Sequence, residues 1–313
     1  MNKYIAVEIG GTKQQIAIGT ADGKIISSEC VVLTPEFTAK DILLWIEDKI
    51  KVILESEKID GIGVGFGGPL ETATGKVLCS LQIDGWENFE LKSWFEDKFK
   101  IKTTVINDTV AGGIGELFCG AGKGSDRLFY TNIGTGIGGG LYFDGNYFDG
   151  SGYGAAYLGN TLVPDLTSGK PGEMTRLELI CSGKSIENRL NSNDYASKSV
   201  FLSAMNGRIN CRMLAEGVRY GDLFCNEELD RIAKTFSIGL VNVLAITGVT
   251  RIVIGGGVAK MGNILFSRIQ KFTDLYAFTA NKNRYVIVGS MLLDGAVPTG
   301  SLIAASGKIN IRR

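Results

Sequence analysis

The sequence predicts an α/β protein built from two lobes. Short apolar segments typical of strands alternate with longer segments in which apolar residues recur at helical spacing. The length of 313 residues also exceeds the usual size of one compact domain, which is about 100–200 residues. We therefore expect two α/β lobes with a cleft between them.

The N-terminal part begins as a hairpin and continues with a helix and a strand. Lys3–Ile9 has the composition of a buried strand, residues 10–13 form a glycine turn, and residues 14–19 form a second strand. Ala39–Ser56 carries apolar residues at helical spacing, and Gly61–Phe66 is another short apolar strand. This order of elements indicates an α/β lobe.

The C-terminal part shows the same alternation. A long helix is predicted over residues 227–247, followed by a strand over 251–254 and a helix from about Lys260. A further strand is predicted over 285–288 and a last helix near Ala296–Ala305. Strands that alternate with helices again indicate an α/β lobe.

The charge composition narrows the class of partner. Lys and Arg together number 33, and Asp and Glu also number 33, with no long run of one sign. The chain therefore lacks the electrostatic footprint of nucleic-acid or anionic-membrane binding. No apolar run reaches the roughly 18 residues of a membrane helix, and the N-terminus turns too early for a signal peptide. We expect a soluble, cytoplasmic protein with a small-molecule partner.

The sequence contains six cysteines and no histidine. No two cysteines lie within four residues of each other, so neither zinc-knuckle spacing nor a disulfide framework is predicted. The absence of histidine excludes a histidine base, a Ser-His-Asp triad and a histidine metal ligand. Any acid–base chemistry is therefore expected to depend on a carboxylate.

Two hairpins share one plan. Residues 5–25 and 128–148 each read as a strand, a Gly/Thr turn, a second strand and an acidic-glycine turn, at an offset of 123 residues. Glycine lets backbone N–H groups approach an anion closely, and threonine adds a hydroxyl donor. Two ordinary hairpins are the alternative interpretation, whereas a phosphate held between two lobes would explain both turns.

A third glycine turn, Gly255-Gly256-Gly257, follows a predicted strand and precedes a helix. On its own it is weak evidence, because strand-to-helix turns often use glycine for packing. The spacing of a dinucleotide fingerprint is missing, and the GxxxxGK[ST] motif does not occur. A bound nucleotide would therefore use neither the Rossmann nor the P-loop mode.

Asp108 is the best candidate for the catalytic carboxylate. It follows a β-rich run at 103–106 and Asn107, and the small residues at 111–113 lead into a predicted helix. The alternative is that Asp108 only caps this helix. An Asp at the end of a strand can also orient a substrate hydroxyl and take its proton, as phosphoryl transfer requires.

These residues together resemble the ROK family of sugar kinases and repressors over nearly the whole chain. The matching segments are EIGGTK at 8–13, GFGGP at 65–69, ND at 107–108, GTGIGGG at 134–140 and GGG at 255–257.

The resemblance implies the two-lobed actin-like ATPase fold, which is ribonuclease-H-like. Residues 1–117 with a C-terminal helix at 297–313 would form the N-terminal lobe, and residues 118–296 the larger C-terminal lobe. ROK repressors carry a DNA-binding domain ahead of this core, whereas here the first strand begins at about Lys3. The resemblance therefore favours a kinase.

The resemblance also implies ATP and Mg²⁺ as cofactors, with Asp108 as the general base. Glu8 stands where the family usually has Asp, so it would keep a carboxylate near Mg²⁺. Gly256 and Gly257 would lie against the adenosine. The ATP phosphates would be held by Gly10, Gly11, Thr12, Lys13, Gly134, Thr135 and Gly136.

On the sugar side the resemblance implies contacts from Gly68, Gln82, Asn107 and Glu178. Two positions depart from the family. Tyr157 and Asn160 stand where the family usually has a sugar-binding Glu and a zinc-binding His, and residues 162–177 hold no cysteine. No zinc site is therefore expected.

The departures leave three hypotheses for the activity. Tyr157 could retune the pocket for another sugar, such as an amino or deoxy sugar, or the protein could be a degenerate sugar- or nucleotide-binding sensor. The third hypothesis is that the protein is an ATP hydrolase. The sequence leaves open the sugar, its reacting hydroxyl, the phosphoryl donor and the oligomeric state, although family habit suggests a homodimer.

Overall fold

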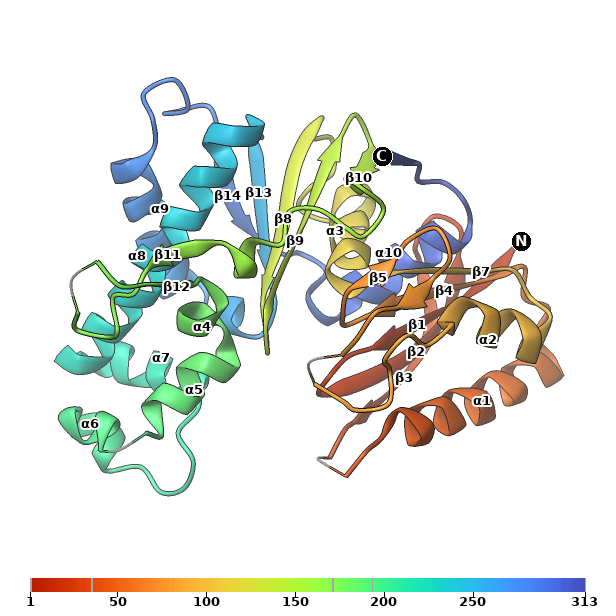
Figure 1. Ribbon diagram of the computed structural model, residues 1–313, viewed down its shortest axis with the longest axis horizontal. Helices are drawn as coiled ribbons and strands as arrows, with labels where there is room; N and C mark the ends of the chain where they lie inside the picture. Colours follow the sequence, from red (N-terminus) through yellow and green to blue (C-terminus); the bar gives the residue numbers. More distant parts are fainter. Residues whose placement is uncertain (1, 35, 81, 171, 193, 313) are drawn as a thin grey trace. The chain divides into compact units, whose positions relative to one another are not determined.

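The computed structural model describes residues 2–34, 36–80, 82–170, 172–192 and 194–312. The chain divides into two compact units (Figure 1). Unit 1 consists of Met1–Tyr130, Gly140–Ala156 and Ser290–Arg313, and unit 2 of Thr131–Gly139 and Tyr157–Gly289. The predicted lobes, 1–117 with 297–313 and 118–296, stay a prediction.

Unit 1 contains a five-stranded sheet with the order β3-β2-β1-β4-β7. The first three strands pair antiparallel, whereas β1, β4 and β7 run parallel. The predicted strands are confirmed, but β3 was missed because its side chains are almost all exposed and lack the alternation of a half-buried strand. The strands are β1 (Lys3–Ile9), β2 (Lys13–Thr20), β3 (Ile25–Val32), β4 (Gly61–Phe66) and β7 (Thr103–Asn107).

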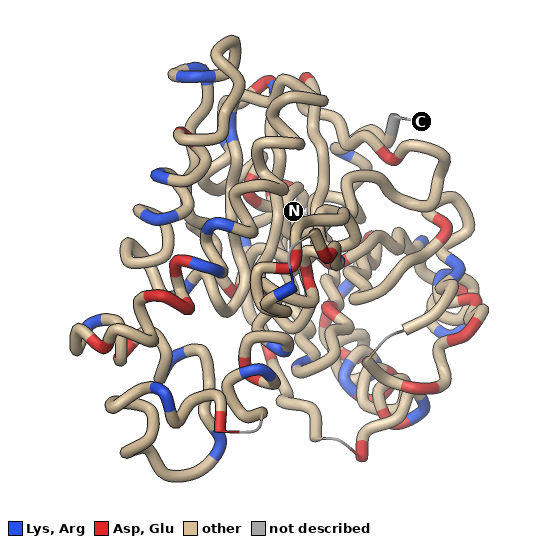
Figure 2. The backbone as a smooth tube through the Cα atoms, turned by 60° about the vertical axis from the view of Figure 1, so that its left-hand side comes forward, with Lys and Arg blue, Asp and Glu red and all other residues tan. Residues whose placement is uncertain are grey.

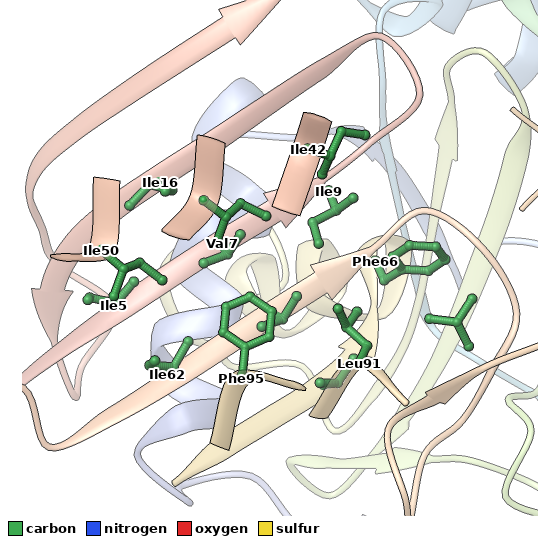
Figure 3. Close-up of a cluster of buried hydrophobic side chains, with 14 of the residues drawn as sticks. Ile5, Val7, Ile9, Ile16, Ile42, Ile50, Ile62, Phe66, Leu91 and Phe95 are labelled. Carbon is green, nitrogen blue, oxygen red and sulfur yellow. The ribbon is translucent and has the colours of Figure 1, made fainter. Parts of the chain in front are cut away.

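One face of this sheet carries the main core of unit 1. Helices α1 (Ala39–Ser56) and α2 (Leu91–Phe99) pack their apolar sides on it. Figure 3 shows Ile5 and Val7 of β1 facing Ile50 of α1 and Phe95 of α2. The capping box that joins Thr38 and Asp41 begins α1 where the periodicity predicted it.

The other face carries helices α3 (Asp108–Cys119) and α10 (Ala296–Ala305). These elements pack closely because small residues face each other. A Cβ on Gly300 would lie 1.7 Å from the carbonyl oxygen of Ala111, and one on Gly63 only 1.9 Å from that of Ser301. The C-terminal helix thus packs on the N-terminal sheet, as the resemblance implied.

A second sheet has six strands in the order β14-β13-β8-β9-β10-β15. The boundary between the units passes through β8 and β9, which form the predicted hairpin at 128–148. Its strands are β8 (Arg127–Ile133), β9 (Ile137–Phe143), β10 (Asn146–Phe148), β13 (Arg251–Gly255), β14 (Val286–Gly289) and β15 (Ile311–Arg312).

Unit 2 is completed by helices, of which those predicted over 227–247 and from about Lys260 are confirmed, whereas the helices between residues 178 and 220 were not predicted. Helix α8 (Leu223–Thr247) begins four residues before the predicted start because Asp222 caps it, accepting the N–H of Cys225 at 2.9 Å. The other helical elements are η1 (Leu158–Asn160), α4 (Glu178–Cys181), α5 (Gly183–Leu190), η2 (Tyr195–Lys198), α6 (Val200–Ser203), α7 (Cys211–Tyr220), η3 (Val258–Met261) and α9 (Asn263–Tyr276).

Two short hairpins and one 3-10 turn complete the two units. Unit 2 has a small hairpin of β11 (Leu162–Pro164) and β12 (Met174–Arg176). Unit 1 has a hairpin of β5 (Leu70–Glu71) and β6 (Lys76–Val77), and the 3-10 turn η4 (Leu293–Gly295) before α10.

The two signs of charge are interspersed along the chain (Figure 2).

In unit 2 the fully buried Glu228 is neutralised by Arg189 and Arg231 and accepts the hydroxyl of Tyr195 at 2.9 Å. No helix in the described ranges is long and apolar enough to cross a membrane.

Candidate active site

The first glycine turn joins β1 to β2 in unit 1. Gly10 donates its N–H to the carbonyl of Lys13 at 3.2 Å, which closes the turn. The turn brings Lys13 Nζ to 3.3 Å from Glu8 Oε2. Lys13 Nζ also lies 4.0 Å from Asp294 Oδ1, a carboxylate that sequence reasoning missed. The turn thus places one cation between two carboxylates.

Glu8 is a buried carboxylate, with 7 % of its surface exposed. Burial raises its pKa to about 7, while the nearby Lys13 ammonium lowers the pKa and Asp108 raises it. Within the described residues Glu8 Oε2 makes no hydrogen bond. A buried oxygen paired only by a nearby charge is a suitable ligand for a hard cation.

The donor set fits a cation that arrives with its ligand better than a resident one. No three Cys, Asp or Glu residues in the described ranges are grouped so that they could hold a metal ion. Mg²⁺ commonly binds through one or two carboxylates and substrate phosphates. Glu8 fits that role, and the predicted lack of a zinc site stays a prediction.

Asn107, and not Asp108, caps helix α3. Its side-chain oxygen accepts the N–H groups of Thr109 at 3.0 Å and Val110 at 3.3 Å. The alternative in which Asp108 serves as the helix cap is therefore wrong. The amide nitrogen of Asn107 donates to the carbonyls of Phe66 at 3.3 Å and Gly68 at 3.1 Å. These four bonds use the full capacity of the amide and fix the segment that carries Gly68.

Asp108 is the first residue of α3 and is half-buried. Its Oδ1 accepts the N–H of Thr109 at 2.7 Å, and its Oδ2 faces Gly67, where a Cβ would lie 3.2 Å away. Burial raises its pKa to about 6, although the hydrogen bonds from Thr109 oppose the shift. A carboxylate of this pKa can act as a base near neutral pH.

Gly67 and Gly68 allow close approach around this carboxylate. Gly67 donates its N–H to the carbonyl of Ile9 at 2.8 Å, which holds the segment to the end of β1. A Cβ on Gly68 would lie 2.8 Å from the carbonyl oxygen of Cys79. Gly67 was missed as a site residue because its role depends on a neighbour far away in the sequence.

Gln82 lies directly against the first turn. A Cβ on Gly11 would fall 1.3 Å from Gln82 Oε1, so only glycine leaves room for this side chain. Unit 1 therefore gathers most of the predicted residues of the N-terminal lobe in one region: Glu8, Gly10, Gly11, Lys13, Gly68, Gln82, Asn107 and Asp108.

The second glycine turn joins β8 to β9 in unit 2. Gly134 donates its N–H to the carbonyl of Gly136 at 2.9 Å, and Gly134, Thr135 and Gly136 are all half-buried. Asn132 supports the turn by accepting the N–H of Gly138 at 2.8 Å. The backbone of this turn is ordered by contacts outside it.

Two further glycines hold the second turn. Gly183, the first residue of α5, donates its N–H to the carbonyl of Gly134 at 2.7 Å. Gly256 has φ +89, and a Cβ there would lie 2.5 Å from the carbonyl oxygen of Ile133. Gly257 has no atom within 4 Å of its hypothetical Cβ, among the residues the structure describes. Gly183 was missed because its sequence signal is one Ser-Gly pair at a helix start.

The predicted sugar-side residues of unit 2 lie near the same turn. Glu178 Oε2 accepts the N–H of Ile137 at 3.2 Å. A Cβ on Gly159 would lie 2.4 Å from the carbonyl oxygen of Ile137 and 3.1 Å from Glu178 Cβ. The half-buried Tyr157 precedes η1 and the exposed Asn160 ends it, so both lie on the turn that Gly159 packs against Ile137.

The fold and these turns define a class: the two-lobed actin-like ATPase fold predicted from the sequence. The ROK family model matches residues 4–307, and the chain belongs to the ROK family.

Relatives span most of the chain. This chain is 28 % identical to a glucokinase of Thermotoga maritima, over 97 % of this chain and 96 % of that protein. A solved structure, a ROK glucokinase from Streptomyces griseus in complex with glucose and AMPPNP, is 25 % identical with a TM-score of 0.81, covering 98 % of this chain and 100 % of that one. A xylose repressor of Caldicellulosiruptor bescii is 26 % identical, over 96 % of this chain and 77 % of the repressor.

Proposed function

We propose that this protein is a sugar kinase that transfers the γ-phosphoryl group of ATP to a sugar hydroxyl. The observation that carries the proposal is Asp108, a half-buried carboxylate with a pKa of about 6 at the start of α3. The glucokinase relatives and the AMPPNP of the similar structure support the same reaction.

In this mechanism Asp108 accepts the proton of the sugar hydroxyl as its oxygen attacks the γ-phosphorus. The bond from the γ-phosphorus to the bridging oxygen breaks, and ADP leaves. Glu8 would hold the Mg²⁺ that accompanies ATP, and this ion would supply positive charge to neutralise the phosphates. A nucleotide-bound cation would also lower the pKa of Glu8 and keep its carboxylate ionised.

The two glycine turns would each bind phosphate. In unit 1 the N–H groups of the first turn and Lys13 would bind phosphate oxygens, as glycine leaves the backbone open. In unit 2 the turn of Gly134, Thr135 and Gly136 would bind phosphate, and Gly256 and Gly257 would lie against the adenosine. Gly257 suits this role because, among the described residues, no atom lies within 4 Å of the position a Cβ would take.

The sugar would contact Gly68, Gln82, Tyr157, Asn160 and Glu178. Asn107 would support the sugar side through its bond to Gly68, and the predicted direct contact from Asn107 would require one of its four amide hydrogen bonds to be exchanged for the sugar. Tyr157 offers a phenol hydroxyl or an aromatic face in place of a carboxylate, which favours a sugar with an acetamido or deoxy position.

The test is a coupled assay of ADP release with Mg-ATP across hexoses, N-acetylhexosamines and deoxy sugars. Turnover that depends on one class of sugar supports the proposal and names the substrate. In the variant Tyr157→Glu we expect increased activity on common hexoses, because a carboxylate accepts two hydroxyl donors. Activity unchanged by this substitution on every sugar would place Tyr157 outside the pocket.

A catalytically degenerate sensor is the second candidate. It is favoured by the loss of a carboxylate at Tyr157 and by the xylose repressor, whose chain this protein matches over 77 % of its length. A sensor would bind nucleotide or sugar in calorimetry and release no ADP with any sugar.

The proposal also covers the cellular location, the oligomeric state and the partners of the protein. We place the kinase in the cytoplasm with ATP, as a homodimer that binds no nucleic acid. Light scattering in solution tests the dimer, since a mass near 33.6 kDa would show a monomer.

A further inference from the structure

We propose that Glu178 is a positioning residue for the second phosphate turn, in addition to its expected contact with sugar. The inference rests on the proposed function, because it assumes that this turn binds nucleotide. Its starting point is the bond from the N–H of Ile137 to Glu178 Oε2 at 3.2 Å. Ile137 directly follows the turn and begins strand β9.

The carboxylate is held against the turn from two directions. A Cβ on Gly136 would lie 3.1 Å from Glu178 Oε2, so the oxygen lies close beside the turn. Gly159 fits between Ile137 and Glu178, and a side chain there would force them apart. The position of Glu178 is therefore determined by packing and does not depend on a single hydrogen bond.

Glu178 also starts a helix that leads to the other support of the turn. Helix α4 begins at Glu178, and α5 begins at Gly183, whose N–H binds the carbonyl of Gly134 at 2.7 Å. The two ends of the turn are thus fastened to one short stretch of chain, 178–183. A change in the position of this stretch would alter the turn.

Electrostatic repulsion and positioning of the turn predict changes of opposite sign in nucleotide affinity when Glu178 is removed. A carboxylate beside a phosphate site repels the ligand, so its removal alone would tighten nucleotide binding. If Glu178 orders the turn, its removal frees the N–H of Ile137 and weakens binding, because the turn must then be ordered by the nucleotide. The sign of the change separates the two effects.

The experiment measures the dissociation constant of Mg-AMPPNP by calorimetry in the absence of sugar. In Glu178→Ala we expect affinity to fall about tenfold, the low end for a charge-assisted hydrogen bond, because Glu178 is half-buried. Glu178→Gln keeps an oxygen acceptor, so its affinity is expected to stay within about threefold of the wild type. Glu173→Ala removes an exposed carboxylate of the adjoining hairpin loop and serves as the matched charge control, with affinity unchanged.

Hydrogen exchange supplies a readout that needs no nucleotide. The peptide spanning residues 134–139 is expected to exchange faster in Glu178→Ala than in Glu178→Gln, at equal thermal stability. Affinity in Glu178→Ala equal to or tighter than the wild type would overturn this inference alone. A wild-type protein that binds no Mg-AMPPNP would overturn the proposed function and this inference with it.

Discussion

Lys13 Nζ lies 3.3 Å from Glu8 Oε2, across the turn that joins the first two strands. The lysine is the cation beside a carboxylate whose pKa burial raises to about 7. Removal of Lys13 would leave Glu8 unpaired, so its pKa would rise further and its carboxyl would stay protonated at neutral pH. Under the proposed function, the first turn would then lose both its phosphate-binding lysine and its cation-binding carboxylate.

We therefore predict that Lys13→Met weakens Mg-AMPPNP binding at pH 7.5 by roughly tenfold or more, measured by calorimetry. Lys24→Met is the matched control, because Lys24 is an exposed lysine in the next turn of the same hairpin. Equal affinities in the two variants would remove Lys13 from the nucleotide site.

The pKa of Asp108 predicts how the rate depends on pH. The base must be ionised, so kcat/KM should fall as the pH drops through about 6 and level off above about 7. Glu8, with a pKa of about 7 in the free protein, would steepen the fall if it binds the cation. Initial rates from pH 5 to 9 measure the profile, and a rate independent of pH over this range would contradict the base assignment.

The same shift predicts a stability effect. The pKa of Asp108 is raised from 3.8 to about 6 in the folded protein, so folding favours the protonated form. This stabilisation is complete below about pH 4 and is lost as the pH rises through 6. At pH 8 the ionised, partly buried carboxylate therefore destabilises the protein, and Asp108→Asn should raise the free energy of unfolding by about 1–2 kcal/mol. Calorimetric melting at pH 8 and pH 4.5 tests this, with a gain expected only at the higher pH.

Glu116 is a buried carboxylate that holds the chain where it enters the last segment of unit 1. It is fully buried and accepts the Ser290 hydroxyl at 2.5 Å and the N–H groups of Ala121 at 2.6 Å, Leu292 at 2.9 Å and Met291 at 3.3 Å. In Glu116→Gln an amide N–H₂ would face some of these donors and leave them unpaired.

We predict that Glu116→Gln lowers the free energy of unfolding by about 2–3 kcal/mol. Glu96→Gln is the control: its carboxylate accepts the single N–H of Thr103 at 3.0 Å, so a loss of about 1 kcal/mol or less is expected. Urea unfolding of both variants measures the difference, and a smaller loss in Glu116→Gln than in the control would refute the anchoring role.

Ala156 has φ +63, a left-handed conformation that disfavours a side chain. Ala156→Gly should therefore raise the free energy of unfolding by up to about 1 kcal/mol. The opposite change at Gly152, which has φ +94, should lower it by at least as much. Thermal melting of the two variants should move in opposite directions, and a lower melting temperature in Ala156→Gly would contradict the strain.

The sequence predicted the elements whose burial leaves a clear pattern of apolar residues. Ala39–Ser56 shows helical periodicity, and Lys3–Ile9 is an almost fully buried strand. Strand β3 shows no such signal, because its edge position leaves nearly every side chain in solvent. Local composition reflects which side chains are buried, and an exposed edge strand buries few of its side chains.

The site residues were predicted less completely than the helices and strands, because local sequence does not show which distant residues the fold brings together. The glycine turns and Asp108 are local sequence signals, so the sequence alone was enough to propose them as site residues. Asp294 reaches Lys13 from the far end of the chain, and Gly183 reaches Gly134 across 49 positions, so only the fold brings them together. Asn107 and Asp108 are adjacent, and their composition could not tell which of them caps α3.

The central claim is that Asp108 is the base of a phosphoryl transfer. The most direct measurement compares the wild type with Asp108→Asn, using steady-state ADP release with the preferred sugar and calorimetric binding of Mg-AMPPNP. The account predicts that turnover falls by about a thousandfold or more while the nucleotide dissociation constant changes by less than about threefold. Turnover and nucleotide affinity that fall together, or turnover that survives the substitution, would contradict it.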